Sequence, residues 1–165
     1  MSVSDAAMDG RQLQALRERW RADGQRVVFT NGCFDLLHVG HLRYLRSARA
    51  LGDRLVIALN DDASTRGLKG PGRPILPFEE RAELLAGLRV VDAVVGFGEP
   101  TALNILRMIA PDIYVKGGDY DEGSKRPPEA DLAESLGARV VFLPFVEGRS
   151  TSAILEQIRD ERDIQ

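Results

Sequence analysis

Apolar runs rich in β-branched residues alternate with stretches of helical periodicity along most of this chain. The runs that predict strands are residues 26–29, 54–59, 112–115 and 138–143, with a fifth inside 90–97. The stretches that predict helices are residues 39–51, 78–88, 100–110, 129–136 and 150–159. A strand followed by a helix, five times over, predicts an α/β fold with a doubly wound five-stranded parallel sheet. Ligands bind such sheets at the carboxyl ends of the strands, where the strand order reverses.

Length and composition predict a single domain. A chain of 165 residues buries roughly 70% of its unfolded surface, enough for one complete core. Its 44% hydrophobic and 28% charged residues are typical of globular proteins. We expect the domain over residues 25–160 and a polar tail over 161–165. Residues 1–24 form an N-terminal extension with one helix, which places Leu13, Leu16 and Trp20 on one face.

Charge and cysteine content exclude several kinds of site. The formal net charge of -3 gives no global attraction to nucleic acid or anionic lipid, so any anion site must be built locally. The one cysteine, Cys33, excludes a disulfide framework and a multi-cysteine zinc site. The chain has no apolar run near the roughly 18 residues that cross a bilayer, and no secretory core at its start. The sequence therefore predicts a cytoplasmic protein with no nucleic-acid or membrane partner.

The strongest chemical signal lies between the first strand and the first long helix, in Thr30-Asn-Gly-Cys-Phe-Asp-Leu-Leu-His-Val-Gly-His41. Gly32 allows a sharp turn where the strand ends, and Gly40 lets a ligand approach the backbone. His38 and His41 are three residues apart where the helix begins, so they share one face. The N–H groups of a helix N-terminus favour anions, and two imidazoles would add donors to phosphate oxygens. This turn predicts a triphosphate site.

Two alternatives remain for these histidines at this point. They are simple capping or surface residues, or they are metal ligands together with Asp35. Three mixed ligands without a further Cys or His are weak support for a metal, and we predict no metal ligands. Their position at the end of the first strand favours phosphate binding.

The same segment resembles the signature of the cytidylyltransferase-like nucleotidyltransferases, whose hallmark is His-x-Gly-His. The resemblance spans about residues 26–159 and implies a Rossmann-like nucleotidyltransferase fold. Taken together, the matching segments most resemble the D-glycero-β-D-manno-heptose 1-phosphate adenylyltransferases, which make ADP-heptose for bacterial surface polysaccharide. Beyond the histidine motif they are Ala58-Leu-Asn-Asp-Asp62, Leu68-Lys-Gly-Pro-Gly-Arg-Pro74, Glu80-Arg81, Val115-Lys-Gly-Gly-Asp-Tyr120 and Glu147-Gly-Arg-Ser-Thr-Ser152.

This resemblance implies transfer of an adenylyl group from ATP to a sugar 1-phosphate, with release of pyrophosphate. The attacking phosphate has a second pKa of about 6, so it is largely dianionic at neutral pH and needs no strong general base. Mg²⁺ bridging the triphosphate is the expected cofactor, and a homodimer is the expected assembly. A sugar kinase is expected as a separate chain, because the extension before the first strand is short.

The resemblance also implies roles for individual residues. The expected catalytic residues are His38, His41, Lys69 and Arg81. The expected nucleotide-binding residues are Asn31, Gly32, Cys33, Phe34, Gly40, Lys116, Gly118, Asp119, Ser150, Thr151 and Ser152. The expected acceptor-binding residues are Asn60, Asp61 and Arg73.

Each of these residue types also has a structural interpretation. Ser150 is well placed as an ordinary helix N-cap, and Asp61 or Asp62 as the cap of the next helix. Taken alone, Arg81 is a solvated surface arginine, and Cys33 a small buried residue. Lys69 and Arg73 also fit a basic surface loop, and Lys116 a lysine-flanked turn.

Two rival functions remain. The first is another nucleotidyltransferase, which uses CTP with an alcohol phosphate or ATP with riboflavin phosphate. The glycerol 3-phosphate branch carries an Arg-Thr pair before the last glycine, whereas this chain has Phe145-Val-Glu-Gly148, which argues against that branch. The second rival is a nucleotide-binding module without turnover. Residues 121–128 carry no signature that favours either.

Overall fold

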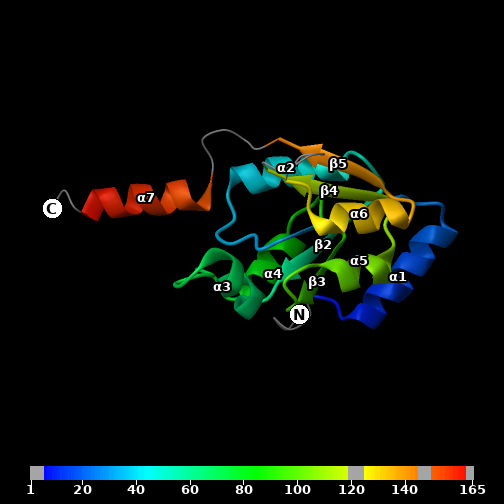
Figure 1. The fold of residues 1–165 in the computed structure, drawn as a ribbon, viewed down its shortest axis with the longest axis horizontal. Coiled ribbons are helices and arrows are strands. Elements are labelled where there is room, and N and C mark those ends of the chain that lie inside the picture. Colours follow the sequence, from blue (N-terminus) through cyan, green and yellow to red (C-terminus); the bar gives the residue numbers. More distant parts are fainter. Residues whose placement is uncertain (1–5, 119–124, 145–149, 163–165) are drawn as a thin grey trace.

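Five parallel strands form one sheet in the computed structural model, in the order β3-β2-β1-β4-β5 (Figure 1). The structure describes residues 6–118, 125–144 and 150–162. The strands are β1 (Val27–Gly32), β2 (Arg54–Asn60), β3 (Ala93–Phe97), β4 (Ile113–Gly117) and β5 (Arg139–Leu143). The helices are α1 (Gly10–Ala22), α2 (Val39–Arg49), α3 (Asp62–Lys69), α4 (Phe78–Ala86), α5 (Leu103–Ile109), α6 (Pro128–Ser135) and α7 (Thr151–Arg162). The expected α/β fold with a doubly wound parallel sheet is confirmed.

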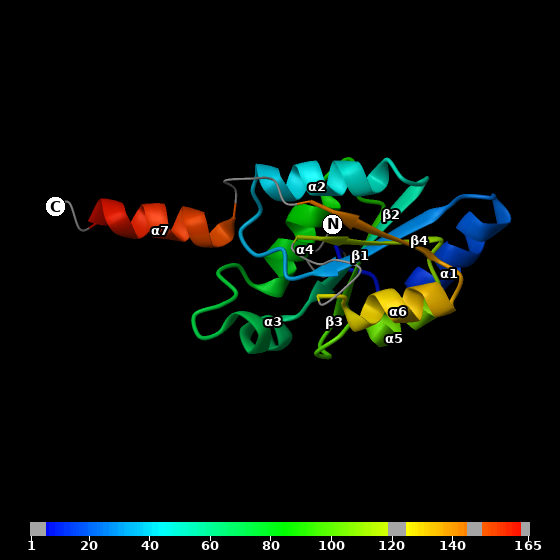
Figure 2. The same ribbon diagram turned by 45° about the horizontal axis from the view of Figure 1, so that its top comes forward.

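Helices cover both faces of the sheet, because alternate residues of each strand point to opposite sides. Leu45 of α2 and Leu85 of α4 pack in one core cluster with Val28 and Ile57. The other cluster joins residues of α1, α5 and α6 to the opposite side of the same strands. Figure 2 shows α2 and α6 on opposite sides of β4 and β1. β2 is buried almost along its whole length, as its apolar run predicts.

The N-terminal helix α1 packs as its spacing predicts. Asp9 caps it by accepting a 2.8 Å hydrogen bond from the backbone N–H of Gln12. Leu13 and Trp20 lie on the face of α1 that packs on the sheet, and both are buried. Arg17, also buried, forms a 3.1 Å ion pair with Asp112 at the start of β4.

The strand order reverses between β1 and β4, which are hydrogen-bonded neighbours although two strand–helix units separate them in sequence. The helices that follow these two strands, α2 and α6, lie on opposite faces of the sheet, and a crevice is expected where the connections part. β1 runs on to Gly32 and β4 to Gly117, each past the apolar run that predicts the strand. Asn31 and Lys116 thus lie at the edge of this crevice.

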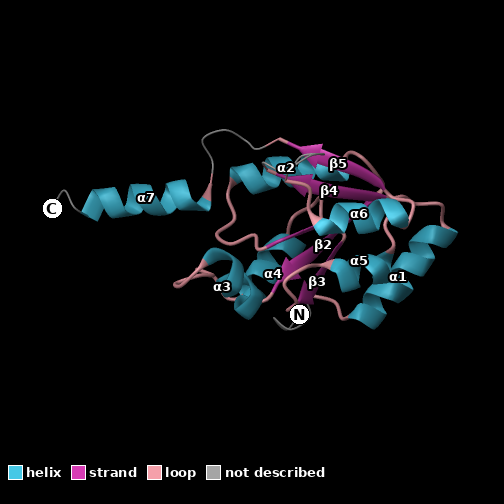
Figure 3. Cartoon of the chain, in the orientation of Figure 1, coloured by secondary structure: helices cyan, strands magenta, loops and turns pink. Residues whose placement is uncertain are grey.

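Two elements differ from the expectation, and a third, α7, stands apart from the rest. For helix α3 only the cap at Asp61 or Asp62 was foreseen, because the helix is eight residues long and buries only Thr65. Helix α5 begins at Leu103 rather than at 100, because the N–H of Ala102 donates to the Glu129 carboxylate instead of entering a helical turn. Helix α7 extends away from the sheet (Figures 1 and 3). Within the described ranges, none of the helices combines the length and apolarity that crossing a membrane requires.

Candidate active site

A cavity of about 910 Å³ opens at the carboxyl ends of β1 and β4. Residues from segments that are distant in sequence meet there, including the turn before α2, the loop after α3 and the start of α7. The lining contains these residues named from the sequence: Asn31, Gly32, Cys33, Phe34, His38, Gly40, His41, Asn60, Lys69, Arg73, Lys116, Gly118, Ser150, Thr151 and Ser152. Arg81 and Asp61 do not line it. Asp119, residues 121–124 and residues 145–149 lie outside the described residues.

His38 and His41 form the N-terminal cap of α2. Nδ1 of His38 accepts from the backbone N–H of Gly40 at 3.1 Å, and Nδ1 of His41 accepts from the N–H of His38 at 3.3 Å. The two ring centroids are 3.9 Å apart. A neutral imidazole that accepts at Nδ1 carries its proton on Nε2. Capping therefore does not compete with phosphate binding: it fixes the tautomer in which Nε2–H is the donor.

The environment of His41 keeps its ring neutral. Burial, and then the charge of His38, lower its pKa to about 4, although Asp35 acts in the opposite direction and Lys69 adds a further lowering. The ring packs against Phe34, with centroids 5.6 Å apart. His41 is thus a neutral hydrogen-bond donor at neutral pH.

Asp35 connects three segments of the site, although sequence reasoning raised it only as a metal ligand. Its carboxylate accepts from Nε of Arg73 at 2.7 Å and from the N–H groups of Ile75 and Leu76. Its backbone carbonyl accepts from the hydroxyl of Thr151 at 2.7 Å. Burial raises the pKa of the Asp35 carboxyl, but these hydrogen bonds and the Arg73 charge outweigh burial and hold that pKa below its usual range.

The backbone around Asp35 is strained. Phe34 and Leu36 have φ values of 45° and 55°, in the left-handed region that bulky residues rarely adopt. This conformation turns the Asp35 side chain toward the loop that carries Arg73, and its carbonyl oxygen toward Thr151. Strain of this kind persists only where surrounding contacts hold it, and here the contacts are those of the site itself.

The start of α7 supplies hydroxyl groups to the cavity. Ser150 caps the helix, because its Oγ accepts from the N–H of Ala153 at 3.1 Å. The capping interpretation of Ser150 is therefore correct, and the residue lines the cavity as well. Thr151 ties this helix end to the turn before α2 through the Asp35 carbonyl.

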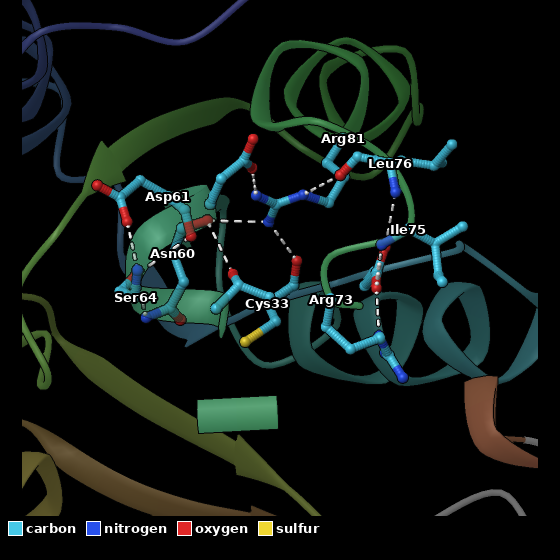
Figure 4. Close-up of polar contacts among 11 residues, drawn as sticks. Cys33, Asn60, Asp61, Ser64, Arg73, Ile75, Leu76 and Arg81 are labelled. Carbon is cyan, nitrogen blue, oxygen red and sulfur yellow. Dashed lines mark hydrogen bonds and ion pairs between the residues drawn. The ribbon is translucent and has the colours of Figure 1, made fainter. Parts of the chain in front are cut away.

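Arg81 is fully buried and does not line the cavity. It is therefore not the solvated surface arginine that its position in the sequence predicts, nor a residue in direct contact with the cavity. Figure 4 shows its guanidinium among carbonyl oxygens of three segments. It donates to Cys33 O at 2.7 Å, Asn60 O at 2.9 Å and Leu76 O at 3.0 Å, and forms a 2.7 Å ion pair with Asp62. Arg81 thus positions the ends of β1 and β2.

Asp61 acts as the N-cap of α3. It accepts from the N–H of Ser64 at 2.7 Å, as Figure 4 shows. The capping alternative is therefore the one that the contacts support. The neighbouring Asn60 does line the cavity, and its Nδ2 donates to Ser64 Oγ at 3.2 Å.

A second polar network lies under the ends of β1 and β4. Nζ of Lys116 donates to the carbonyl oxygen of Asn31 at 3.0 Å, and Tyr114 OH donates to Asn31 Oδ1 at 3.0 Å. Burial lowers the pKa of the Lys116 ammonium, and the Glu129 charge opposes this shift. No sequence motif marks Glu129 as part of the site.

Tyr44 of α2 also lines the cavity and was missed by sequence reasoning. Its hydroxyl lies 2.7 Å from Thr30 Oγ1 and donates to Val115 O at 3.3 Å. Burial raises the pKa of the Tyr44 phenol well above its ordinary value, so the group stays protonated. The only sequence signal for Tyr44 was its position three residues after His41, which places both residues on one face of α2.

The family model described as cytidylyltransferase-like matches residues 29–154, a range that includes every segment of this cavity. The chain belongs to the cytidylyltransferase-like family. This confirms the family resemblance of the histidine turn.

Curated relatives extend this family match over most of the chain. Bifunctional protein HldE of Ectopseudomonas mendocina (strain ymp) is 51% identical over 150 residues, which are 91% of this chain and 31% of that protein. Bifunctional protein HldE of Syntrophotalea carbinolica is 53% identical over 152 residues, 90% of this chain and 30% of that protein. The chain thus spans about three tenths of the length of these relatives.

Two solved structures share the fold of this family member. A lipopolysaccharide core biosynthesis protein from Thermoplasma volcanium GSS1 is 28% identical, with a TM-score of 0.61 over 76% of this chain and 99% of that one. A pantoate-beta-alanine ligase from Francisella tularensis, complexed with beta-gamma ATP and beta-alanine, is 16% identical, with a TM-score of 0.57 over 88% of this chain and 68% of that one. At that identity the second likeness concerns the fold alone.

Proposed function

We propose that this member of the cytidylyltransferase-like family transfers the adenylyl group of ATP to D-glycero-β-D-manno-heptose 1-phosphate, giving ADP-heptose and pyrophosphate. The family supports nucleotidyl transfer. Identities of 51% and 54% to proteins named HldE, and the collinear motifs of the heptose branch, support this substrate pair. The name of the Thermoplasma volcanium protein, which refers to lipopolysaccharide core biosynthesis, agrees with a sugar phosphate as acceptor.

The observation that carries the proposal is the pairing of two imidazole donors with a helix N-terminus inside one cavity. Nδ1 of each histidine is occupied by a backbone N–H, so Nε2 carries the proton that a phosphate oxygen accepts. The N–H groups that begin α2 and α7 add donors of the same kind. Lys69 and Lys116 line the same cavity and supply positive charge.

These groups match what nucleotidyl transfer requires. A phosphate oxygen of the sugar 1-phosphate attacks the α-phosphorus, and the bond to the pyrophosphate oxygen breaks. The nucleophile is already largely dianionic, so the protein needs to bring two anions together and stabilise the charge that spreads over the transition state. A neutral His41 performs this task as a hydrogen-bond donor and transfers no proton.

Mg²⁺ enters this proposal as part of the nucleotide substrate. Among the described residues, no group of three His, Cys, Asp or Glu side chains has the arrangement of a metal site. The Asp35 carboxylate is already occupied by Arg73 and two backbone N–H groups. Magnesium at phosphoryl-transfer sites keeps several waters and is bound by substrate phosphates with one or two carboxylates. We therefore assign His38, His41 and Lys69 to the phosphate oxygens, and the ion to the triphosphate.

The proposal extends to assembly and location. We infer a homodimer and a cytoplasmic location, where ATP is available. We also infer that a sugar kinase activity supplies the 1-phosphate. The relatives named bifunctional are about three times as long as this chain, which leaves room in them for a second activity.

Pyrophosphate release across a matrix of substrates tests the proposal. The triphosphates are ATP, CTP, GTP and UTP, and the acceptors are the heptose 1-phosphate, glycerol 3-phosphate and riboflavin 5′-phosphate. We expect release with ATP and the heptose 1-phosphate together, and background rates with every other pair. Release with CTP and glycerol 3-phosphate would instead assign a cytidylyltransferase. ATP binding by calorimetry without release from any pair would assign a binding module.

A further inference from the structure

Glu129 is a buried carboxylate in a cavity built for anions. It is 5% exposed, lies in the first turn of α6 and lines the cavity beside Asn31 and Lys116. The other carboxylate in the described lining, that of Asp35, is paired with Arg73. Glu129 forms no ion pair with any described residue. A negative charge here repels both anionic substrates, so a purely structural role would be served better by a neutral side chain.

The two oxygens of Glu129 have different surroundings. Oε1 accepts from the backbone N–H of Ala102 at 2.9 Å, and the Asn31 amide nitrogen lies 3.5 Å away. In the described part of the chain, no donor contacts Oε2. That part of the chain also has no fully buried side-chain oxygen without a partner. Oε2 therefore keeps its exposure, and the open space that Glu129 borders is the cavity.

The network around Glu129 fixes the direction of this second oxygen. The fully buried Tyr114 donates to Asn31 Oδ1, which orients the amide nitrogen of Asn31 toward Glu129. Ala102 at the start of α5 holds the same oxygen, Oε1, from the other side. With Oε1 held by two groups, the carboxylate has little freedom to rotate, and Oε2 is pre-oriented for a ligand.

We propose that Oε2 of Glu129 accepts a hydrogen bond from a substrate hydroxyl, so that this side of the cavity selects a polyhydroxylated ring. A carboxylate oxygen accepts and does not donate, and it repels anions, so a substrate hydroxyl is a hydrogen-bond donor that suits it. Asn31 directly precedes the turn that leads to the histidines, so Glu129 borders the phosphate site. Ribose and sugar rings are the groups bonded directly to the phosphates. The inference rests on the proposed function and names its hydroxyl subsite.

The isosteric change Glu129→Gln tests this proposal sharply. Because Ala102 and Asn31 both donate to Oε1, the glutamine keeps its oxygen there and presents its NH₂ group where Oε2 was. The fold therefore keeps its hydrogen bonds, while the ligand hydroxyl loses its charged acceptor. Glu83→Gln, an exposed glutamate of α4 outside the cavity, is the matched control. Thermal unfolding of both variants should match that of the wild type.

The readout separates the two sources of the hydroxyl group. If the ribose supplies it, E129Q lowers kcat/KM for ATP on the order of 10-fold or more but leaves 2′-deoxy-ATP or 3′-deoxy-ATP unaffected. If the acceptor sugar supplies it, E129Q raises KM for the sugar 1-phosphate by a similar factor and leaves the ATP to deoxy-ATP ratio unchanged. Either result supports the proposal.

Unchanged values of both quantities in E129Q would overturn it and leave Glu129 as a cap for α5. Binding of ATP and its deoxy analogues, measured by calorimetry, keeps the test independent of turnover. A wild-type chain that binds ATP without releasing pyrophosphate refutes the proposed function. The hydroxyl contact is then still decided by the ratio of ATP to deoxy-ATP affinities in E129Q and wild type, and an unchanged ratio refutes it.

Discussion

Nη1 of Arg81 lies 2.7 Å from the carbonyl oxygen of Cys33 and so joins helix α4 to the turn that carries the two histidines. The same nitrogen lies 2.9 Å from the carbonyl oxygen of Asn60 at the end of β2. One buried guanidinium thereby fixes the spacing of two neighbouring strand ends. The planar fork of arginine suits this task, because its five N–H donors have fixed directions.

Replacing Arg81 by lysine should weaken the fold and the active site together. Lysine keeps the positive charge but has one nitrogen in place of three, so carbonyl oxygens of Cys33, Asn60 and Leu76 lose donors. We expect a loss of about 1–3 kcal/mol in unfolding free energy, the typical cost of leaving a buried hydrogen-bond acceptor without its donor. Urea denaturation measures it, with the exposed Arg66→Lys as control. A variant of wild-type stability with weakened ATP binding would instead indicate direct ligand contact.

Truncation of His41 should affect turnover more than ATP binding. The Nε2–H donor is lost in His41→Ala, and the loss of one transition-state donor typically reduces kcat on the order of 10²-fold or more. Steady-state kinetics with saturating substrates measures the effect. His41→Gln, which can place an amide donor near the former Nε2 position, should recover part of the rate. An unchanged kcat in His41→Ala would remove His41 from the catalytic role.

The depressed pKa of His41 should make the fold less stable in mild acid. Its pKa is about 4 in the folded chain, against an ordinary value of 6.5. Between these values the unfolded chain binds more protons, so stability falls as the pH drops from 6.5 toward 4 and is unaffected by this group above 6.5. Allowing for solvent screening, we expect a loss of roughly 2–3 kcal/mol over this window.

Chemical denaturation at pH 7, 5.5 and 4.5 measures that loss. His41→Asn retains an acceptor for the N–H of His38 and removes the titrating ring, so its stability should change less over this range. Equal pH dependence in variant and wild type would show that other groups, and not His41, control it.

Sequence patterns predicted the sheet because its strands are buried on both faces and therefore read as continuous apolar runs, as in β2. For α3 they indicated only the cap at Asp61 or Asp62, because this eight-residue helix buries a single residue, Thr65. They gave His38 and His41 two competing interpretations, whereas the two imidazoles cap the helix and line the cavity at once. Local spacing does not show which ring nitrogen the backbone occupies, and it is the occupation of Nδ1 that lets one imidazole serve both purposes.

The position of Arg81 was beyond any local pattern. Its first-turn place in a polar helix segment is typical of a surface residue, yet the carbonyl oxygens of Cys33 and Asn60 bury it. Glu129 was missed for the same reason, since its partner Ala102 is 27 residues away. Hydrogen bonds to residues distant in sequence determine the positions of Arg81 and Glu129. A single sequence does not show which distant residues form such bonds.

Asp35 and Arg73 should contribute unequally to stability, although they form one ion pair. Asp35→Asn leaves the Arg73 charge and the N–H groups of Ile75 and Leu76 with one neutral acceptor oxygen, and we expect a loss of about 3–5 kcal/mol. Arg73→Gln leaves Asp35 its two backbone donors and should cost about 1–2 kcal/mol. Thermal and urea unfolding of both variants measure this asymmetry. Equal losses would mean that the ion pair, and not the loop anchoring, is what Asp35 provides.

Two glycine-to-alanine changes should shift stability in opposite directions. A Cβ on Gly117 would lie 2.6 Å from Cε2 of Tyr44, whose ring is held by Thr30 and Val115 and has little room to move. We expect Gly117→Ala to destabilise the fold by about 1–3 kcal/mol. A methyl group added at Gly67 in α3 would meet no atom within 4 Å, so Gly67→Ala should gain up to about 1 kcal/mol of helix propensity.

Urea denaturation of both alanine variants provides the comparison, with Gly67→Ala as the control for the added methyl group. Tyr44→Ala in the Gly117→Ala background removes the clashing ring, so the two changes together should cost less than the sum of their separate effects. Strict additivity would show that the Tyr44 ring moves aside freely. In that case Tyr44 would not be the residue that fixes α2, and with it the two histidines, against the end of β4.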